Sequence, residues 1–363
     1  MSKVKIKVDD LKDGLDYLNA GFQKTGSSLE SGLMHMEISK GAWLVISTHS
    51  RYTSVRYAVP LIGKAEDFEA LIGYETFRNI ATSMPEEMEI TLTSNKTHVE
   101  LEGTGKYRFV KFDTLFEAKQ PETTELGSLE FEDIHEVVTR ASQFTTEKAG
   151  TLEGKTVRLS YEEDTELLTA QTFDGSTAAQ FSVSVKGLKP FDMYLKGSEL
   201  SKISRREGTA TLVSSGEMWG ISIPRGRLLM IGLNEVDPST EIVNTVIEKS
   251  RPYDFEVSGI HLEAVVKRLL NYEPDALIAE VSDDQLTLKA KTVSGIQGQE
   301  VIPVAHTGEL NIVLPTRVLG NLFKIAGKSN IKFQVDQEGL SAMVEGDVNG
   351  ASYRLLFSVQ GEA

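Results

Sequence analysis

A short alternating strand followed by an amphipathic helix occurs three times in this chain of 363 residues. Apolar residues recur at positions i, i+4 and i+7 in every copy and also at i+3 in two of them, the spacing that places them along one face of an α-helix. The stripes begin at Leu11, Ile134 and Leu262, so successive copies lie 123 and 128 residues apart. A period of this length predicts internal duplication, which constrains the fold more than any single motif does.

A second pattern, a helix followed by two or three alternating strands, also occurs three times. Its strands are expected within 88–112, 210–231 and 331–357. Polar, proline-containing stretches at Glu117–Gly127 and Asp237–Asp254 read as linkers between the copies. The sequence therefore predicts an α+β chain of three tandem domains, each with two helices packed on antiparallel sheets. We expect the domains at 1–122, 127–244 and 252–363, and the helices at 9–24, 73–84, 131–148, 196–207, 259–272 and 315–328.

Composition excludes several classes of protein. Hydrophobic residues make up 40% of the chain, which is enough for packed cores. There is no cysteine, so disulfides, thiolate metal sites and cysteine nucleophiles are excluded. No apolar run approaches the ~20 residues that span a membrane, and the first ten residues lack the apolar centre of a secretory signal. We therefore expect a cytoplasmic protein with no membrane partner.

No pattern in the chain indicates catalysis. None of the six histidines has another at the i, i+4 spacing of a helical metal site. Gly103–Lys106 resembles a phosphate loop only faintly and reads as a hairpin turn, because it lies between two expected strands. Acidic pairs such as Asp283–Asp284 lie in polar stretches and read as solvated surface. We therefore predict no enzyme, no metal and no cofactor. A hydrolase with two close carboxylates in a deep pocket, a site that sequence cannot reveal, stays open as an alternative.

The expected helices differ in charge from the rest of the chain. The whole chain has 38 basic and 53 acidic residues, a net charge of −15. The six helix ranges hold 14 basic and 12 acidic residues, a net charge of +2, which leaves −17 for the remainder. The helix bases are Lys12, Lys24, Arg78, Arg140, Lys148, Lys196, Lys202, Arg205, Arg206, Lys267, Arg268, Arg317, Lys324 and Lys328. A surface made of these helices suits a phosphate backbone, and no base-reading motif accompanies it.

Four segments resemble, in order and position, the bacterial-type β sliding clamp, the DNA polymerase III beta subunit family. They are Phe77–Ile80 with Met84–Glu86, Thr172–Gly175, Leu233–Pro238, and Asn311–Phe357. The resemblance covers the whole chain. Two departures from the family are Ser176–Ala178, where a His-Arg-Leu-like run is usual, and the residues after Phe357, where the family usually ends in a Pro-Met-Arg-like tail. Such a divergent clamp fits a protein of a phage or another mobile element. It would act in the bacterial cytoplasm, which is the host cytoplasm if the protein is phage-encoded.

The resemblance implies a head-to-tail homodimeric ring with the helices around its hole. The ring would encircle double-stranded DNA without reading its sequence, and would tether the replicative DNA polymerase as a processivity factor. A clamp loader is a further implied partner, and the clamp catalyses nothing itself. The alternative is a structural or adaptor protein of repeated α+β domains, for example a virion component.

The resemblance also implies three groups of site residues. The DNA-binding residues of the pore would be Lys24, Arg78, Arg140, Lys196, Lys202, Arg205, Arg206, Lys267, Arg268, Arg317, Lys324 and Lys328. A pocket for partner peptides would use Leu152, Phe173, Thr177, Ala178, Pro238, Val243, Leu355, Leu356 and Phe357. The dimer interface would use Tyr107, Phe109, Lys111, Leu269 and Leu270, of which the two leucines could equally be core.

Overall fold

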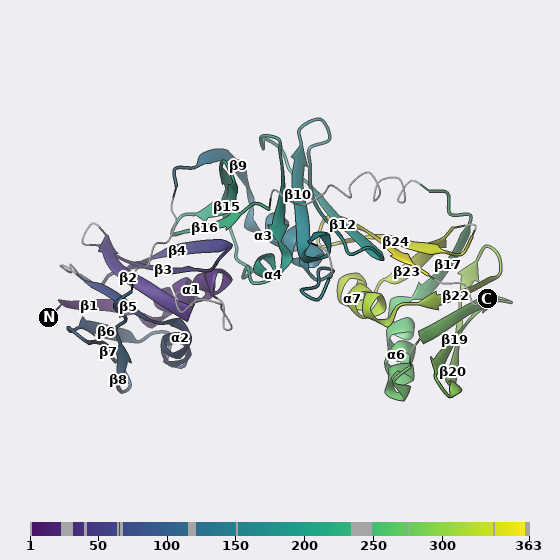
Figure 1. Cartoon of the computed structure of the whole chain (residues 1–363), viewed down its shortest axis with the longest axis horizontal. Helices are drawn as coiled ribbons and strands as arrows, with labels where there is room; N and C mark the ends of the chain where they lie inside the picture. The colour runs from purple at the N-terminus through teal and green to yellow at the C-terminus, as the bar shows by residue number, and fades with distance from the viewer. Residues whose placement is uncertain are drawn as a thin grey trace. The chain divides into compact units, whose positions relative to one another are not determined.

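The computed structural model is an α+β chain whose strands form antiparallel sheets, as the sequence predicted. It describes residues 2–22, 32–39, 42–63, 65, 68–114, 121–149, 152–233, 249–274, 276–336 and 338–359. The chain divides into two compact units (Figure 1). Unit 1 comprises Met1–His135, Lys186–Pro190 and Glu199–Asn234, and unit 2 comprises Glu136–Val185, Phe191–Ser198 and Glu235–Ala363.

Unit 1 contains one large and one small antiparallel sheet. In order across the large sheet, the strands are β5 (Glu69–Gly73), β2 (Leu33–Ser39), β3 (Trp43–His49), β4 (Thr53–Pro60), β16 (Gly226–Ile231), β15 (Met218–Ile223), β14 (Thr209–Ser215) and β9 (Thr124–Glu130). In the small sheet they are β1 (Ser2–Lys7), β6 (Glu89–Ser94), β7 (His98–Glu102) and β8 (Lys106–Val110). The segment Gly103–Lys106 forms the predicted turn between β7 and β8.

Unit 2 repeats this plan. In order across its large sheet, the strands are β13 (Phe191–Lys196), β10 (Thr156–Glu162), β11 (Leu167–Phe173), β12 (Thr177–Ser184), β25 (Ala351–Ser358), β24 (Ser341–Val348), β23 (Asn330–Val335), β17 (Tyr253–Ser258) and β21 (Ala305–His306). In its small sheet they are β20 (Gly295–Pro303), β19 (Gln285–Thr292), β18 (Ala276–Ser282) and β22 (Leu310–Leu314).

The two large sheets match strand for strand, apart from the added β21. Each large sheet has an early half, formed by strands that come first in its part of the sequence, and a late half. The halves pair through β4 and β16 in unit 1 and through β12 and β25 in unit 2. The register also matches, since Val55 lies opposite Leu228 as Ala179 lies opposite Leu355. This correspondence supports the internal duplication that the repeated patterns predicted. The three-domain boundaries stay a prediction, because each compact unit joins strands from two of the expected domains.

Five of the six expected helices form, each shorter than its predicted range. They are α1 (Val8–Leu18), α2 (Tyr74–Thr82), α3 (Phe131–Ser142), α6 (Gly259–Leu269) and α7 (Thr316–Ala326). Short 3₁₀ turns follow α1 at Asn19–Gly21 and α6 at Leu270–Tyr272, and another lies at Glu153–Lys155. At the end of α7, Gly327 has a φ of 57° and its N–H donates to the carbonyl of Phe323, 3.1 Å away. A backbone conformation suited to glycine therefore terminates the helix that carries Lys324.

The helix expected at 196–207 is wrong over most of its length. Only α4 (Gly197–Leu200) is helical, and Lys196 is the last residue of β13. The next residues bond to other elements instead, since the carbonyl of Ile203 is 3.1 Å from Nε2 of His135 and the Ser204 hydroxyl donates to the carbonyl of Asp16. Tertiary partners thus replace the i to i−4 bonds that the apolar spacing suggested.

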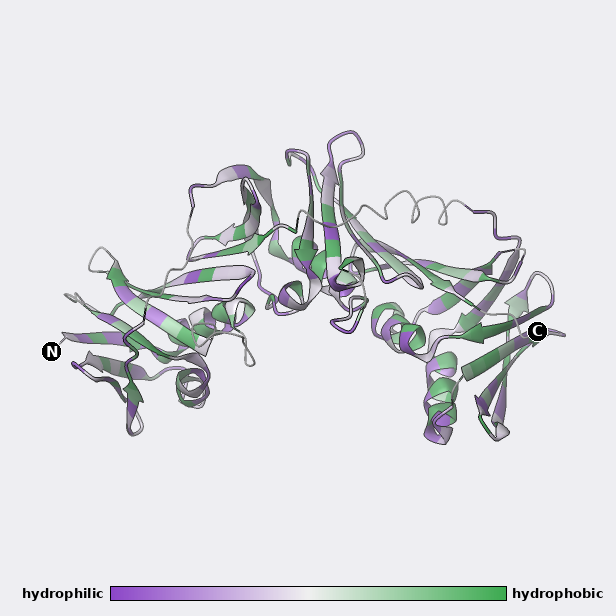
Figure 2. Cartoon of the chain, in the orientation of Figure 1, coloured by the Kyte–Doolittle hydropathy of each residue, from purple (hydrophilic) through white to green (hydrophobic). Residues whose placement is uncertain are grey.

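The core of each unit lies between the helices and one face of the sheets. Helix stripes that include Leu11, Leu15 and Leu262 are fully buried, as are sheet residues such as Trp219 and Phe333. Figure 2 shows the corresponding alternation of hydrophobic and hydrophilic residues along the strands. Within the described ranges, no helix is long and apolar enough to cross a membrane.

Candidate nucleic-acid interface

The basic residues expected at a DNA surface in unit 1 are mostly held by carboxylates. Arg206 lies between elements rather than on a helix, and only 14% of its side chain is exposed. Its guanidinium is 4.9 Å from the ring centre of Tyr17 and 5.5 Å from that of Tyr57. It also forms an ion pair of 3.2 Å with Asp13 and a hydrogen bond to the carbonyl of Asp13. These contacts make Arg206 a packing residue of unit 1.

The other three basic residues of this group in unit 1 are also paired. Arg78 on α2 contacts Asp16 on α1 at 2.8 Å, and Arg205 pairs with Glu132. Lys202 is 3.3 Å from Glu199, a carboxylate that is 2% exposed. Glu199 also accepts hydrogen bonds from the hydroxyls of Ser50 and Thr53, at 3.4 and 3.1 Å. Lys202 therefore balances a buried charge, which is a structural task.

In unit 2, Arg140 joins α3 to α7. Its Nε donates to Glu136 at 2.5 Å, and its Nη1 donates to the carbonyl of Lys324 at 3.1 Å. Glu136 also accepts a hydrogen bond from the side-chain amide of Asn349, at 3.2 Å. The side chain of Arg140 is 15% exposed, so little of its charge reaches solvent.

The remaining paired bases of unit 2 are more exposed. Lys267 on α6 forms an i, i+4 ion pair of 2.6 Å with Glu263, and Lys196 is 3.5 Å from Glu147. Arg317 on α7 is 3.3 Å from Asp174 and also donates to the carbonyls of Phe144 and Thr145. Arg268 on α6 donates to Glu300 on β20 through two nitrogens. These hydrogen bonds hold the pKa of Glu300 below its ordinary value.

Two of the expected bases differ from all the others. Lys324, in the last turn of α7, and Lys328, just beyond it, are exposed, and neither has an ion-pair partner among the described residues. Lys24 lies outside the described residues. The structure thus pairs nine of the eleven described bases with acids, which sequence spacing alone did not predict.

The expected positive charge of the helices is wrong as well. The six described α-helices carry seven basic and ten acidic residues, a net charge of −3 where +2 was expected. Seven bases and two acids of the expected ranges are not in these helices, and four of the bases are Lys196, Lys202, Arg205 and Arg206, which fall outside α4. Four aspartates on α1 remain inside the observed bounds.

An apolar row crosses the other face of the large sheet in unit 2. Phe173, Ala178, Leu356 and Met343 lie opposite one another on β11, β12, β25 and β24, so their side chains share one face. The last three are 3 to 7% exposed and pack as one cluster, with the half-buried Phe173 against it. We call these four residues the apolar row. Met343 was not predicted, because only the strand register shows that it joins the others.

The remaining residues predicted for the peptide pocket divide into three groups. Leu355 and Phe357 alternate with Leu356, are 0 and 1% exposed, and point into the core, where Phe357 meets Phe333 edge-on. Thr177 lies opposite Phe357 and shares that inner face. Leu152 is 37% exposed, outside the cluster. Pro238 and Val243 lie outside the described residues.

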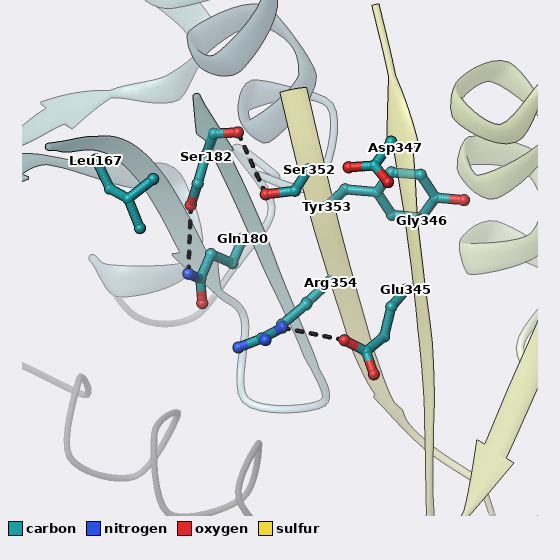
Figure 3. A pocket seen from close by; sticks show the side chains of 9 residues that line it. All are labelled: Leu167, Gln180, Ser182, Glu345, Gly346, Asp347, Ser352, Tyr353 and Arg354. Atoms are coloured by element: carbon teal, nitrogen blue, oxygen red, sulfur yellow. Dashed lines mark hydrogen bonds and ion pairs between the residues drawn. The ribbon is translucent and has the colours of Figure 1, made fainter. Parts of the chain in front are cut away.

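A polar cavity of about 350 Å³ lies beside the apolar row on the same sheet (Figure 3). Gln180, Ser182, Glu345, Asp347 and Arg354 are among the residues that line it. Arg354 donates to Glu345 at 3.2 Å, so this cation is also paired. In the part of the chain that the structure describes, no group of three or more His, Asp or Glu could hold a metal ion.

The residues expected at a dimer interface lie near two open sheet edges, β8 and β20. Tyr107 on β8 is half-buried, whereas Phe109 is 6% exposed and packs edge-on against Phe77, with ring centres 5.1 Å apart. Leu269 is a core residue, 1% exposed, whereas Leu270 is 39% exposed. Lys111 follows β8 and donates to the carbonyl of Glu69. Large apolar side chains at or near both edges are exposed, namely Val110, Phe112, Ile296 and Val301.

Duplicated antiparallel sheets with amphipathic helices against one face define the class of α+β fold to which this chain belongs. No family model matches the chain, and no curated protein matches it in sequence. Solved structures match its fold along the whole length. The DNA polymerase III beta subunit of Thermotoga maritima has a TM-score of 0.85 at 15% identity, with 100% of both chains covered.

Two structures from Pseudomonas aeruginosa are similarly close in fold. Its sliding clamp bound to griselimycin has a TM-score of 0.82 at 14% identity, with 99% of each chain covered. Its DNA polymerase III subunit beta in another crystal structure has a TM-score of 0.81 at 14% identity, covering 99% of this chain and 100% of that one. The chain therefore has the β sliding clamp fold that the sequence resemblance predicted.

Proposed function

We propose that this protein is a DNA sliding clamp, a ring that encircles duplex DNA and tethers a replicative polymerase without catalysing a reaction. The full-length match to β clamps supports the proposal, and so does the pairing of half-sheets within the chain. The small sheet of unit 1, in the order β8-β7-β6-β1, corresponds to the late half of each large sheet. The small sheet of unit 2, in the order β20-β19-β18-β22, corresponds to the early half.

The duplicated register predicts how two copies join. Within each large sheet the early half pairs with the late half through one antiparallel strand pair. Each small sheet corresponds to one half only, so its edge strand β8 or β20 lacks the strand with which its counterpart pairs. We propose that β20 of one copy supplies it for β8 of another. Matching the registers of the large sheets places Gly298 opposite Tyr107, as Val55 lies opposite Leu228. Such an interface is head-to-tail, so two copies can close into a ring.

The proposed ring holds DNA by topology and by phosphate contacts, which carry no sequence information and therefore permit sliding. A polymerase bound to the ring stays near the primer end, because tethering raises its effective concentration there. We place the partner peptide of the polymerase or loader on the apolar row of unit 2. The row offers Phe173, Leu356 and Met343 beside the polar cavity that could orient a polar flank of the peptide.

Two measurements test the proposed function. Native mass should give about 80 kDa, twice the 40.0 kDa of one chain. Protein loaded onto a nicked circular plasmid should stay bound through gel filtration and leave when a restriction enzyme linearises the DNA. Homo-oligomers much larger than a dimer, with no effect on primer extension, would instead support a structural or adaptor protein. Equal release from circular and linear DNA would exclude a topological clamp.

A further inference from the structure

The described bases predicted for the pore form two groups, those that pair with a carboxylate and those that do not pair with any described residue. We propose, resting on the proposed function, that among the eleven described bases predicted for the pore, phosphate contact is made by Lys324 and Lys328, at the C-terminal end of α7. The other nine described bases of the predicted pore serve as structural ion-pair partners. The ring would then hold DNA mainly by topology, with few electrostatic contacts.

The first observation is that carboxylates neutralise nine of the eleven described bases. An ion pair presents almost no net charge to a distant phosphate, and a phosphate must displace the carboxylate to bind. Arg140 and Arg206 are at most 15% exposed, so they would also have to leave packed positions. Lys324 and Lys328 face solvent and need no such exchange with any described residue.

The second observation is the charge of each long helix. On α1 four acidic residues outnumber one lysine, a net charge of −3, and on α3 three acidic residues outnumber one arginine, a net charge of −2. On α6 the net charge is +1, and on α7, which contains no acidic residue, it is +2. Cations pair with three of the four acids on α1 and with two of the three on α3, so neither helix offers phosphate a free positive charge, whereas Lys324 on α7 does.

The third observation is how α7 is held. Arg317, Asn321 and Lys324 lie along one stripe at i, i+4 and i+7, and Lys328 follows Gly327, the residue that ends the helix. Arg317 and Asn321 donate to the carbonyls of residues 143–145, directly after α3. Arg140 donates to the carbonyl of Lys324 itself. The backbone beneath Lys324 is thus fixed at both ends of the stripe, while its ammonium group stays in solvent.

A purely local role for these lysines makes a different prediction. Cations near a helix C-terminus stabilise the helix through its dipole. If that were their whole role, removing the charges would lower the thermal midpoint and leave DNA retention unchanged. Phosphate binding instead predicts a change in retention with little change in stability.

The experiment measures how the dissociation constant for a short duplex depends on salt, using fluorescence anisotropy and the full-length protein. Counterion release gives a slope of about −0.9 per phosphate contact. Two lysines in each of two copies predict a slope of about −4, whereas contacts by all eleven described bases predict about −20. A wild-type slope near −20 would overturn the proposal.

Variants assign the contacts to residues. Lys324→Glu with Lys328→Glu should weaken duplex binding at least tenfold, bring the slope close to zero and shorten retention on nicked circles. The matched control, Arg205→Glu with Lys267→Glu, makes the same charge change on two exposed but paired bases and should leave the slope near −4. Equal effects of the two double variants would overturn the confinement to α7.

Two further controls keep the outcomes distinct. Lys324→Gln with Lys328→Gln tests the same contacts if the glutamate variant fails to fold, and circular dichroism checks each variant. If wild-type protein is not retained on circles, the proposed function fails. If it is retained and the lysine variants are retained equally, with unchanged slopes, only the present inference fails.

Discussion

One equivalent position of the repeated helix is occupied by a different residue or makes a different contact in each copy. Tyr17, Arg140 and Arg268 each follow the first apolar residue of their repeated helix by six positions. The ring of Tyr17 lies 5.6 Å from that of Tyr57, centre to centre, whereas Arg268 donates to Glu300. The sheet register places Tyr57 and Glu300 at equivalent positions, opposite Ile46 and Leu288. An aromatic contact between α1 and an inner strand of the large sheet is therefore replaced by an ion pair between α6 and an open sheet edge.

Arg206→Ala should destabilise unit 1 by about 1–3 kcal/mol, because the change leaves Asp13 without its cation and removes contacts with two tyrosine rings. Urea unfolding monitored by circular dichroism would measure the loss. Arg205→Ala is the control, since its side chain is 66% exposed and its loss should cost less than about 0.5 kcal/mol. Similar losses in the two variants would contradict the structural role of Arg206.

Asp336 predicts an acid-dependent loss of stability. Burial by itself would raise the pKa of this 1% exposed carboxyl. The hydrogen bonds from Ser341, from the N–H of Leu340 and from Lys249 outweigh burial and hold the pKa below its ordinary value. Because the folded pKa lies below the unfolded value of ~3.9, the stabilisation is present above that pH and is lost as the pH falls through the folded pKa.

Asp336→Asn should therefore lower the unfolding free energy at pH 7 by about 1–3 kcal/mol. The difference between wild type and variant should shrink as the pH falls from 5 toward 2. Urea denaturation across that range would measure it. A difference that stays constant with pH would show that the charge of Asp336 does not contribute.

At the scale of elements, the periodicity of apolar residues predicted the helices whose formation depends on residues close together in the sequence. The stripes of α1, α3, α6 and α7 predicted helices because one turn of apolar spacing depends on neighbours a few residues away. The fourth helix was wrong because its segment bonds to α1 and α3, which are distant in sequence. Six of the nine ion pairs were missed for the same reason, since their partners are distant in sequence; Arg206 and Asp13, for example, are 193 residues apart.

The candidate peptide site was predictable only in part. Phe173, Ala178 and Leu356 were predicted from the family resemblance, and the register brings them together. Leu355 and Phe357 were grouped with Leu356 by sequence, but strand alternation turns them into the core. Met343 required knowledge of which strand pairs with β25.

Replacing Leu356 with Asp and Met343 with Ser should abolish binding of a polymerase-derived peptide by placing polar groups in the apolar row. Isothermal titration calorimetry with the C-terminal peptide of the cognate polymerase would measure the change. Thr169→Asp, on the same sheet face but away from the row, is the control. Undiminished peptide affinity in a folded double variant would place the site elsewhere.

Glu300→Tyr should strengthen the proposed contact between copies. The change gives β20 the residue type found at the equivalent position of β4, and Arg268 could lie over its ring as Arg206 lies over that of Tyr57. We expect the dimer dissociation constant to fall about three- to tenfold. Sedimentation equilibrium would measure it, with Thr287→Tyr on the opposite face of the small sheet as the control. A weaker dimer would contradict the register assigned to β8 and β20.

At the scale of the whole molecule, the proposed ring depends on the two open edges. Tyr107→Asp places a charge on β8 at the position matched to Gly298, where desolvation on pairing is unfavourable. We expect native mass to shift from about 80 to about 40 kDa and retention on circular DNA to be lost. Tyr107→Phe should keep both properties. A dimer that survives the aspartate would require a different contact surface.

The position of β16 has a consequence for synthesis on the ribosome. The early strands of unit 1 end at an edge, β4, whose partner begins at Gly226, more than 160 residues later. A nascent chain must therefore carry an unpaired strand while its second half emerges, and an unpaired edge invites strands from other molecules. Intermolecular exchange at β4 would use the same hydrogen-bonding pattern as the proposed union of β8 with β20. Expression level and chaperone concentration should then determine how often neighbouring nascent chains aggregate through β4 before each large sheet is complete.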